Sequence, residues 1–305
     1  MADWDAEVAI DQELVRALLA EQFPELDAGS ARLLAEGWDY SVWVVEERWA
    51  FRFTRREVAI PGVRRELEVL PRLARLLPVP VPEPRFAGMP SDRFPWPFFG
   101  AALLPGVEPA DAELDDADRL ELGAELGRVL RVLHAPETLA EVDPERVLPV
   151  DLNRRSDMKF RLPRARENLA ALEASDVWSA PADVEAVLAS AEALPATDGE
   201  LVLAHGDLHQ RNVLVDGGVL AAIIDWVDVC RADPCIDLVP FWSLLTHSGR
   251  ERFLVEYGQV TDDQLLRSRV LAIGLDSMLA LYAHEVGNQR LTRETRAALE
   301  RTLAD

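Results

Sequence analysis

Three oxygen-bearing side chains in the second half of the sequence have the types and the spacing that phosphoryl transfer requires. The pattern is His205-x-Asp207-x-x-x-x-Asn212, followed by a short apolar hairpin and then by Asp225. That reaction needs one carboxylate to accept or orient the proton of an attacking hydroxyl. It also needs a second carboxylate and an amide oxygen to hold Mg²⁺ against the phosphates. Because Mg²⁺ prefers hard oxygen ligands and retains several waters, one carboxylate and one amide are enough.

Each part of this pattern has a simpler interpretation when it stands alone. An H-x-D triplet is common, and Asp225 could be a surface residue at the end of a strand. Together, however, the spacing matches the H-R-D-x-x-x-x-N pattern of kinases and the magnesium-binding aspartate that follows it. Apolar strands flank both parts, and polar side chains at the ends of buried strands are costly unless they bind something.

The first third of the sequence predicts a small antiparallel sheet with flanking helices. Short apolar segments separated by turn residues are typical of a strand meander, and apolar residues at helical spacing follow them. Pro61-Gly62 is expected to break the chain, and the prolines of residues 78–84 enforce extended backbone. The predicted elements are helices at residues 11–22 and 63–77 and strands at residues 31–36, 41–46, 49–54 and 98–104.

The remainder of the sequence is mainly helical. The polar pattern itself follows an apolar segment at residues 201–204, and Asp216-Gly217-Gly218 predicts a tight turn between two short strands. We therefore expect an α+β, two-lobed fold with a small antiparallel N-terminal sheet, residues 1–104, and a larger helical lobe, residues 105–305. A cleft between such lobes is a favoured place for a ligand. Helices are predicted at residues 116–134, 153–174, 182–194 and 235–246, and strands at 213–215 and 220–224.

The chain resembles the aminoglycoside phosphotransferase family, which comprises small-molecule kinases with a protein-kinase-like fold. The resemblance runs from about residue 31 to about residue 245, and HGDLHQRN and IDWVD followed by DPCIDL are its most specific parts. Gly206 stands where protein kinases have the arginine of H-R-D, Trp226-Val227 replaces Phe-Gly, and no A-P-E segment follows. These differences indicate a free small molecule, rather than a protein, as the substrate.

The resemblance implies roles for the residues that match the family's motifs. Asp207 would be the catalytic base, and Asn212 and Asp225 would bind Mg²⁺. His205 would brace the catalytic loop, and Asp237 would hold that loop through hydrogen bonds. His209 also follows the family pattern, with a structural role as reasonable as a catalytic one.

The N-terminal lobe is then expected to bind the nucleotide, ATP or GTP. Lys159 is the only lysine of the sequence, so the phosphate-binding role of the usual kinase lysine would fall to Arg52, with Glu66 as its partner. Arginine is a reasonable substitute because its planar fork grips phosphate bidentately. The segment from Gly37 to Ser41 is a candidate phosphate-covering loop and reads equally well as a hairpin turn. The linker that includes Ala102 and Leu104 should offer backbone groups to the purine.

The acceptor site is expected in the helical lobe. Residues 270–286 form a helix that is apolar almost all round, which suggests burial. Asp276 interrupts it, and a buried carboxylate needs a partner, either a substrate amine or an internal arginine. Tyr282 and Glu285 are further acceptor candidates. For each of these residues a purely structural role is a standing alternative.

The charge of the chain restricts its partners. With 54 acidic and 32 basic residues the net charge is −22, which argues against nucleic acid and anionic membranes because both need basic surfaces. A cationic small molecule is permitted. The N-terminus has no signal-peptide pattern, and two cysteines without a disulfide framework suggest a reducing cytoplasm. The oligomeric state is left open.

Four functions are compatible with these observations. The first is an antibiotic kinase that transfers the nucleotide γ-phosphate to a hydroxyl of an aminoglycoside or, alternatively, of a macrolide; the net charge favours the aminoglycoside. The second is a kinase of the same fold for a metabolite such as an amino alcohol or a sugar. The third is a metal-dependent phosphohydrolase, since H-G-D-x-H is superficially like dinuclear metal motifs. The fourth is a nucleotide-binding protein without catalysis.

Overall fold

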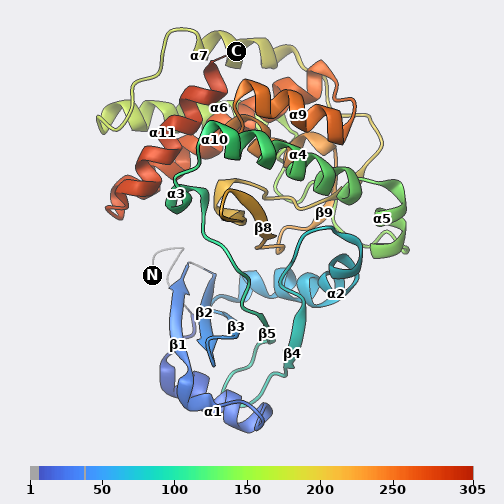
Figure 1. The fold of residues 1–305 in the computed structure, drawn as a ribbon, viewed down its shortest axis with the longest axis vertical. Helices are drawn as coiled ribbons and strands as arrows, with labels where there is room; N and C mark the ends of the chain where they lie inside the picture. The colour runs from blue at the N-terminus through green and yellow to red at the C-terminus, as the bar shows by residue number, and fades with distance from the viewer. Residues whose placement is uncertain (1–6, 38, 305) are drawn as a thin grey trace. The chain divides into compact units, whose positions relative to one another are not determined.

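The computed structural model describes residues 7–37 and 39–304, and the chain divides into two compact units. The first unit comprises the chain up to Leu76 together with Pro80–Leu104, and the second comprises Leu77–Val79 and the chain from Pro105 onward. Both are drawn in Figure 1.

The first unit is built on a five-stranded antiparallel sheet with the strand order β1-β2-β3-β5-β4 among the residues described. The strands predicted at the positions of β1, β2, β3 and β5 are confirmed. The fourth strand lies directly after the proline-rich segment and was not predicted. The strands are β1 (Arg32–Glu36), β2 (Tyr40–Val45), β3 (Trp49–Thr54), β4 (Pro84–Gly88) and β5 (Phe98–Ala102).

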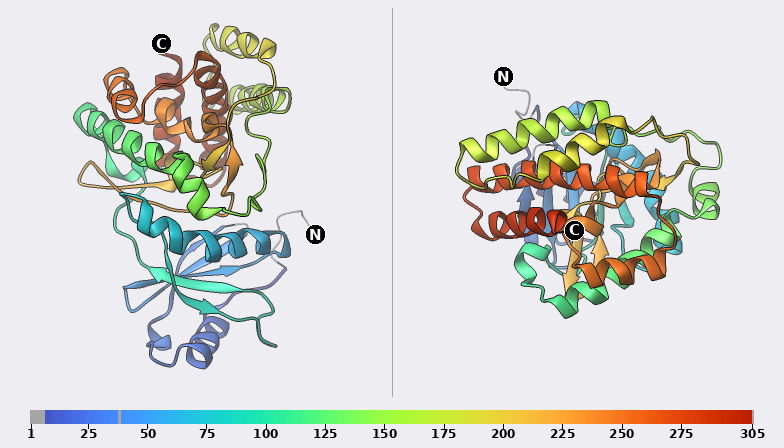
Figure 2. Two further views of the ribbon diagram at one scale, coloured as in Figure 1. Left: turned by 90° about the vertical axis from the view of Figure 1, so that its right-hand side faces the viewer. Right: turned by 90° about the horizontal axis from the view of Figure 1, so that it is seen from above.

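Side-chain alternation along β3 gives this sheet two different faces. Phe51 and Phe53 are fully buried in an aromatic cluster that includes Phe23, Phe94 and Phe98. Arg52 lies between the two phenylalanines and therefore projects from the opposite face. Helix α1 (Gln12–Gln22) covers the aromatic face and α2 (Ile60–Leu76) covers the other, as Figure 2 shows.

Helix α2 begins earlier than predicted. Pro61 and Gly62, expected to break the chain, lie in its first turn. Proline is tolerated there because the first backbone N–H groups of a helix have no intrahelical acceptor. The expectation of a break at this position was therefore wrong, and the helix runs on through Pro71 as well.

The second unit consists of helices around two small two-stranded sheets, β6 with β9 and β7 with β8, among the residues described. The turn between β7 and β8 forms at Gly217 and Gly218, whose φ angles of 57° and 83° suit glycine. The strands are β6 (Val202–Ala204), β7 (Val213–Asp216), β8 (Val219–Ile223) and β9 (Cys230–Ala232). The helices are α3 (Pro109–Ala112), α4 (Asp116–Leu133), α5 (Pro136–Val142), α6 (Met158–Ala174), α7 (Val184–Ser190), α8 (Val239–Ser243), α9 (His247–Tyr257), α10 (Asp262–Glu285) and α11 (Gln289–Leu303).

The start of α6 differs from the prediction of a helix over residues 153–174. The helix begins at Met158, where the Asp157 side chain caps it by accepting the Phe160 N–H. Residues 153–157 instead form a loop around Asp151, whose carboxylate accepts the backbone N–H groups of Arg155 and Ser156. These bonds give the loop backbone an alternative to helix.

Helices α4 and α9 approach each other through glycine. A Cβ on Gly123 would lie 2.2 Å from the carbonyl oxygen of Gly249, and one on Gly249 would lie 2.7 Å from the carbonyl oxygen of Arg119. Such contacts are with backbone, which cannot give way without moving a helix. Within residues 7–37 and 39–304, none of the helices has the length and apolar character needed to span a bilayer.

We expect Gly123→Ala to destabilise the folded protein by about 1–3 kcal/mol, the usual range for overpacking. Gly274→Ala in α10 is the matched control, since its Cβ would meet Ala165 at an ordinary 3.5 Å. The control should be neutral or more stable by about 0.5–1 kcal/mol because alanine favours helix over glycine. Urea unfolding of both variants measures the difference, and equal stabilities would contradict the close approach of α4 and α9.

Candidate active site

The loop after β6 is held by the carboxylate of Asp237. Oδ2 accepts the backbone N–H of His205 at 2.7 Å, Oδ1 accepts that of Gly206 at 3.0 Å, and His134 Nε2 lies 3.2 Å from Oδ2. These bonds confirm the hydrogen-bonding role predicted for Asp237. Burial alone would raise the pKa of Asp237, but the hydrogen bond and charge of His134, with contributions from His205 and the Gly206 N–H, bring the pKa below its ordinary value.

The backbone conformation and the close packing at position 206 both require glycine. The φ of Gly206 is 85°, and a Cβ there would lie 2.1 Å from the carbonyl oxygen of Asp228. The position that carries arginine in protein kinases therefore has no room for a side chain in this protein. The chain passes directly against the segment that follows Asp225.

His205 connects the loop to the strand before Asp225. Its Nε2 lies 2.9 Å from the carbonyl oxygen of Ile224, and its Nδ1 accepts the Asp207 N–H at 3.2 Å. The ring also packs on Trp226, with centroids 4.5 Å apart. His205 thereby ties the backbone of Asp207 to the strand that leads into Asp225.

The carboxylate of Asp207 is 23% exposed and has one oxygen engaged. Arg155 Nη2 donates to Oδ1, whereas Oδ2 lies 3.8 Å from His209 Nε2, beyond hydrogen-bonding distance. The Arg155 guanidinium also lies 3.7 Å from Asp228 Oδ2, which accepts a 2.6 Å bond from Asn153 Nδ2. Oδ2 of Asp207 is thus the oxygen open to a substrate proton.

Asn212 and Asp225 belong to the same neighbourhood as Asp207. Asn212 Nδ2 donates to the Asp207 carbonyl at 2.9 Å, which leaves its Oδ1 as an acceptor, and the Asn212 carbonyl accepts the Ile224 N–H at 3.0 Å. Asp225 has a φ of 66°, a conformation that non-glycine residues seldom adopt and that clusters at functional sites. The pKa of Asp228 is raised by burial and further by the negative charges of Asp207 and Asp225. The three carboxylates therefore share one electrostatic environment.

His209 contributes structure to this loop. Its Nδ1 accepts the Arg211 N–H at 3.2 Å, and burial lowers its pKa despite the opposing effect of the Asp207 charge. The imidazole is consequently neutral at physiological pH. Among the described residues, no group of three or more His, Cys, Asp or Glu side chains could hold a metal ion.

In the first unit, the predicted partnership of Arg52 and Glu66 is present. Arg52 Nη1 lies 2.8 Å from Glu66 Oε1, Glu66 is fully buried, and the Arg52 guanidinium lies 3.7 Å from the centroid of the Tyr40 ring. Ser41 is also buried, and its hydroxyl accepts from Trp43 Nε1 at 3.1 Å.

The predicted phosphate-covering loop and purine-binding linker belong to the same unit. The Gly37 N–H donates to the Tyr40 carbonyl at 2.8 Å, whereas Trp38 lies outside the described residues. Ala102 pairs with Trp49, and Leu104 is the last residue of the unit. The predicted loop and the predicted linker lie at opposite ends of β3. Thr54, the last residue of β3, pairs with Tyr40, and Trp49, its first residue, pairs with Ala102.

The three predicted acceptor residues all lie on α10 but differ in burial. Asp276 is fully buried, where Oδ1 accepts from Gln210 Nε2 at 2.9 Å, and burial raises its pKa to about 7. Its Oδ2 and the Gln210 Oε1 have no hydrogen-bond partner among the described residues. The ring of Tyr282 lies under the Arg211 guanidinium, 5.5 Å from ring centroid to Cζ, and Glu285 is exposed.

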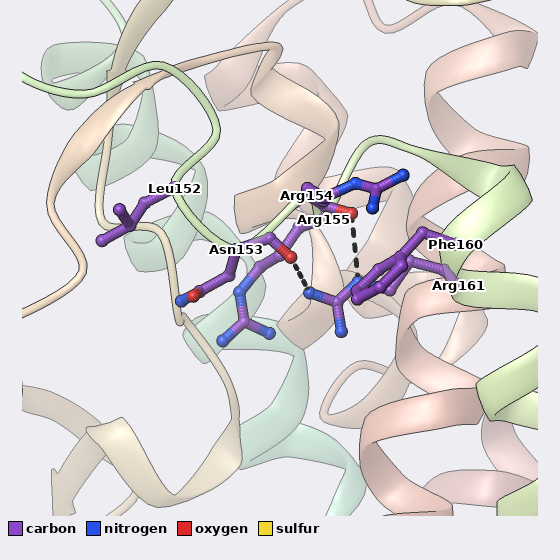
Figure 3. A pocket seen from close by; sticks show the side chains of 6 residues that line it. All are labelled: Leu152, Asn153, Arg154, Arg155, Phe160 and Arg161. Atoms are coloured by element: carbon purple, nitrogen blue, oxygen red, sulfur yellow. Dashed lines mark hydrogen bonds between the residues drawn. The ribbon is translucent and has the colours of Figure 1, made fainter.

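A cavity of about 370 Å³ opens beside the loop that carries Asp207 (Figure 3). Its position follows from Arg155, which lines it and also contacts Asp207. Arg161 contributes a guanidinium that donates to the carbonyl oxygens of Asn153 and Arg154. The cavity is lined by Leu152, Asn153, Arg154, Arg155, Phe160 and Arg161.

Comparison with known proteins agrees with this geometry. The model of the phosphotransferase enzyme family matches residues 30–270, which is most of the chain. The chain belongs to the phosphotransferase enzyme family. The predicted resemblance and the predicted α+β, kinase-like fold are thereby confirmed, and the chain is a phosphotransferase enzyme. No curated protein matches this phosphotransferase by sequence.

Several solved structures share the fold of this phosphotransferase. The GDP complex of aminoglycoside 2'-phosphotransferase-IIIa is 20% identical, covering 97% of this chain and 99% of that chain with a TM-score of 0.69. Macrolide 2'-phosphotransferase MphH from Brachybacterium faecium is 23% identical over 95% and 98% of the two chains, with a TM-score of 0.60. The streptomycin–ATP–APH(2'')-IIa ternary complex is 17% identical over 96% and 97%, with a TM-score of 0.57.

Sequence reasoning missed Arg155 and Asp228 in this phosphotransferase. Asp228 stands within the IDWVD motif, and its position three residues after Asp225 was the available signal. Arg155 carried no such signal, because the segment around it was predicted to be helical. Its contact with Asp207 joins residues 52 positions apart.

The buried carboxyl of Asp276 predicts a pH-dependent stability. Folding raises its pKa from 3.8 to about 7, so its stabilising contribution is complete below pH 3.8 and is lost as the pH rises through about 7. Asp276→Asn removes this titration. The Tm of the variant relative to the wild type should therefore be higher at pH 8 than at pH 6. Asp263→Asn, an exposed aspartate of the same helix, should show no such change, and equal differences at both pH values would contradict the prediction.

Proposed function

We propose that the chain transfers the γ-phosphoryl group of a nucleoside triphosphate to a hydroxyl group of a small molecule. The observation that carries the proposal is the single hydrogen-bonded unit formed by Asp207, Asn212 and the strand into Asp225. Membership of a phosphotransferase family supports the same chemistry.

Asp207 would act as the base. Arg155 holds Oδ1, so Oδ2 is oriented to accept the proton of the acceptor hydroxyl as the oxygen attacks phosphorus. His205 and Asp237 touch neither reactant in this scheme. They fix the backbone of the loop, which keeps the Asp207 carboxylate in place without reorganisation during the reaction.

Asn212 and Asp225 would hold Mg²⁺. The donor set fits that ion, because one amide Oδ1 and one carboxylate are hard oxygen ligands and Mg²⁺ completes its shell with water and phosphate. The negative charges of Asp207 and Asp225, which raise the pKa of Asp228, would also attract a cation. When bound, Mg²⁺ supplies charge neutralisation for the phosphates.

Residues 1–104 would bind the nucleotide. Arg52, oriented by Glu66 and Tyr40, would contact a phosphate, and Gly37 and Ser41 would present backbone groups of the preceding turn. The linker at Ala102 and Leu104 would offer backbone groups to the purine. One of the similar structures is a GDP complex and another is a complex with ATP, so the proposal covers both nucleotides.

An aminoglycoside acceptor remains a prediction from the sequence. The structural neighbours include aminoglycoside and macrolide kinases, and likeness of fold does not choose between them. Near Asp207 the charges are mixed, with Asp225 and Asp228 negative and Arg155 and Arg161 positive. A phosphohydrolase is less favoured, because a dinuclear metal site needs clustered His and carboxylate ligands and the described residues hold no such cluster.

Asp207→Asn should lower kcat by about 10²–10⁴-fold, the usual contribution of general-base catalysis. It should leave Mg²⁺-dependent nucleotide binding nearly intact. Asp225→Asn should instead weaken the Mg²⁺-dependent binding, since it removes a metal ligand. Nucleotide consumption over a panel of hydroxyl compounds, with calorimetric binding of MgATP and MgGTP, measures both effects. Full turnover by the Asp207 variant would remove that residue from the role of base.

Arg52→Ala should raise the KM for nucleotide by about 10–100-fold, as expected for loss of a charge-assisted hydrogen bond to phosphate. Because Arg52 is paired with the buried Glu66, its loss should also lower stability, so the assay is run well below the Tm of the variant. Arg52→Lys is a companion variant that preserves the positive charge. Arg48→Ala, at an exposed arginine of the same unit, should leave the KM unchanged. An unchanged KM for Arg52→Ala would mean that Arg52 binds no phosphate.

A further inference from the structure

We propose that the cavity beside Asp207 binds an anionic group of the acceptor, so that the phosphorylated molecule is a hydroxyl compound carrying a carboxylate, phosphate or sulfate. The proposal rests on the proposed function, because it names the acceptor class of the same site. It is carried by the charge, the burial and the contacts of the arginines that line the cavity.

The segment that forms the cavity is basic in an otherwise acidic protein. Residues 153–164 contain four arginines and Lys159 but a single acidic residue, Asp157, although the chain has a net charge of −22. Asp157 is paired with Arg154 at 2.5 Å and caps α6. The charge of the other basic groups is therefore not cancelled within the segment. Phe160 contributes an apolar wall that is itself covered by guanidinium groups of Arg154 and Arg164, 4.3 and 3.6 Å from its centroid.

Arg155 links the cavity to the base. Its side chain is only 8% exposed, and one Nη group donates to Asp207 while its Nε has no hydrogen-bond partner among the residues described. Guanidinium has five N–H donors in a rigid fork. It can therefore keep Asp207 and still donate to a second oxygen-bearing group. A molecule whose hydroxyl reaches Asp207 has its neighbouring substituent within reach of the same arginine.

Arg161 supplies a second positive charge whose contacts are neutral. Its guanidinium donates to the carbonyl oxygens of Asn153 and Arg154, and within the described part of the chain no carboxylate forms an ion pair with it. Burial, followed by the positive charge of Arg155, lowers its pKa to about 10 against the opposing charges of Asp151 and Asp207. The group is still charged at neutral pH. An anion in the cavity would offset both the burial and the repulsion between the two arginines.

The same features disfavour a polycationic acceptor. An ammonium group placed in this cavity would meet like charges that are partly removed from solvent, where screening is weak. Placing like charges beside each other is an effective way for a protein to reject a ligand, here a polycation. The γ-phosphate of the nucleotide is the other available anion, but the Mg²⁺ proposed at Asn212 and Asp225 would already neutralise the charge of that group. We therefore assign the cavity to the acceptor.

The test uses four hexose probes that share a ring and differ in charge: glucosamine, glucose, glucuronate and glucose 6-phosphate. Their binding to the full chain is measured calorimetrically at one ionic strength and neutral pH. Kanamycin is included as a polycation, and MgATP and MgGTP are titrated separately. The variants are Arg161→Gln, Arg161→Lys, and the control Arg166→Gln. The substitution Arg166→Gln removes one positive charge from α6, as Arg161→Gln does. Arg166, however, forms surface ion pairs with Glu185 and Glu192.

We expect glucuronate or glucose 6-phosphate to bind at least tenfold more tightly than glucose, and glucosamine and kanamycin to bind more weakly than glucose. Which anion binds better distinguishes a carboxylate from a phosphate acceptor. Arg161→Gln should abolish the preference, Arg161→Lys should keep part of it, and Arg166→Gln should keep all of it. Nucleotide affinity should not change in any of the three.

The proposal is overturned if no anionic probe binds tenfold better than glucose, or if the preference survives in Arg161→Gln. It is also overturned if Arg161→Gln weakens nucleotide binding as much as probe binding, because the cavity would then serve the phosphate donor. The proposed function fails separately, through absence of Mg²⁺-dependent nucleotide binding or of nucleotide consumption in the wild type.

Discussion

A buried carboxylate fixes the catalytic loop of this phosphotransferase. Asp237 is fully inaccessible to solvent, yet its pKa lies below the ordinary value, chiefly because of the hydrogen bond and charge of His134 and further because of His205 and the Gly206 N–H. A buried charge without such partners would be strongly destabilising. With these partners, the Asp237 carboxylate fixes the backbone of the first residues after β6. Gly206 then passes against Asp228, which leaves Asp207 and Asn212 in one short loop beside Asp225.

Most of the fold was readable from the sequence because its signals are local. The strands of the first unit follow from apolar segments between turn residues, and the β7–β8 turn follows from Gly217 and Gly218. The N-cap of α1 is Asp11, a residue type that favours this position. Proline misled the prediction twice. It concealed β4, and at Pro61 it suggested a break where a first helical turn accepts it.

The proposed catalytic and metal-binding residues could be named from the sequence because they stand close together at a characteristic spacing. Arg155 could not, since arginine is a good helix former and a short loop before a helix reads as part of it. What keeps the segment out of the helix is the Asp151 carboxylate, which captures the N–H groups of Arg155 and Ser156. That contact, and the contact of Arg155 with Asp207, depend on tertiary structure. Asp276 was singled out correctly as a buried carboxylate, but its hydrogen-bond partner, Gln210, comes from the catalytic loop.

The contrast between whole-chain charge and local charge bears on the acceptor. A net charge of −22 describes a field averaged over the surface, which salt screens beyond about 8–10 Å. A bound molecule beside Asp207 responds instead to the groups within that distance, and there the arginines of residues 153–164 counter the carboxylates. Arg155 belongs to both sets, since it donates to the base and also lines the cavity. A substrate anion that engages this arginine would therefore be aligned with the carboxylate that accepts the proton. Recognition of the acceptor and activation of its hydroxyl would then depend on one side chain.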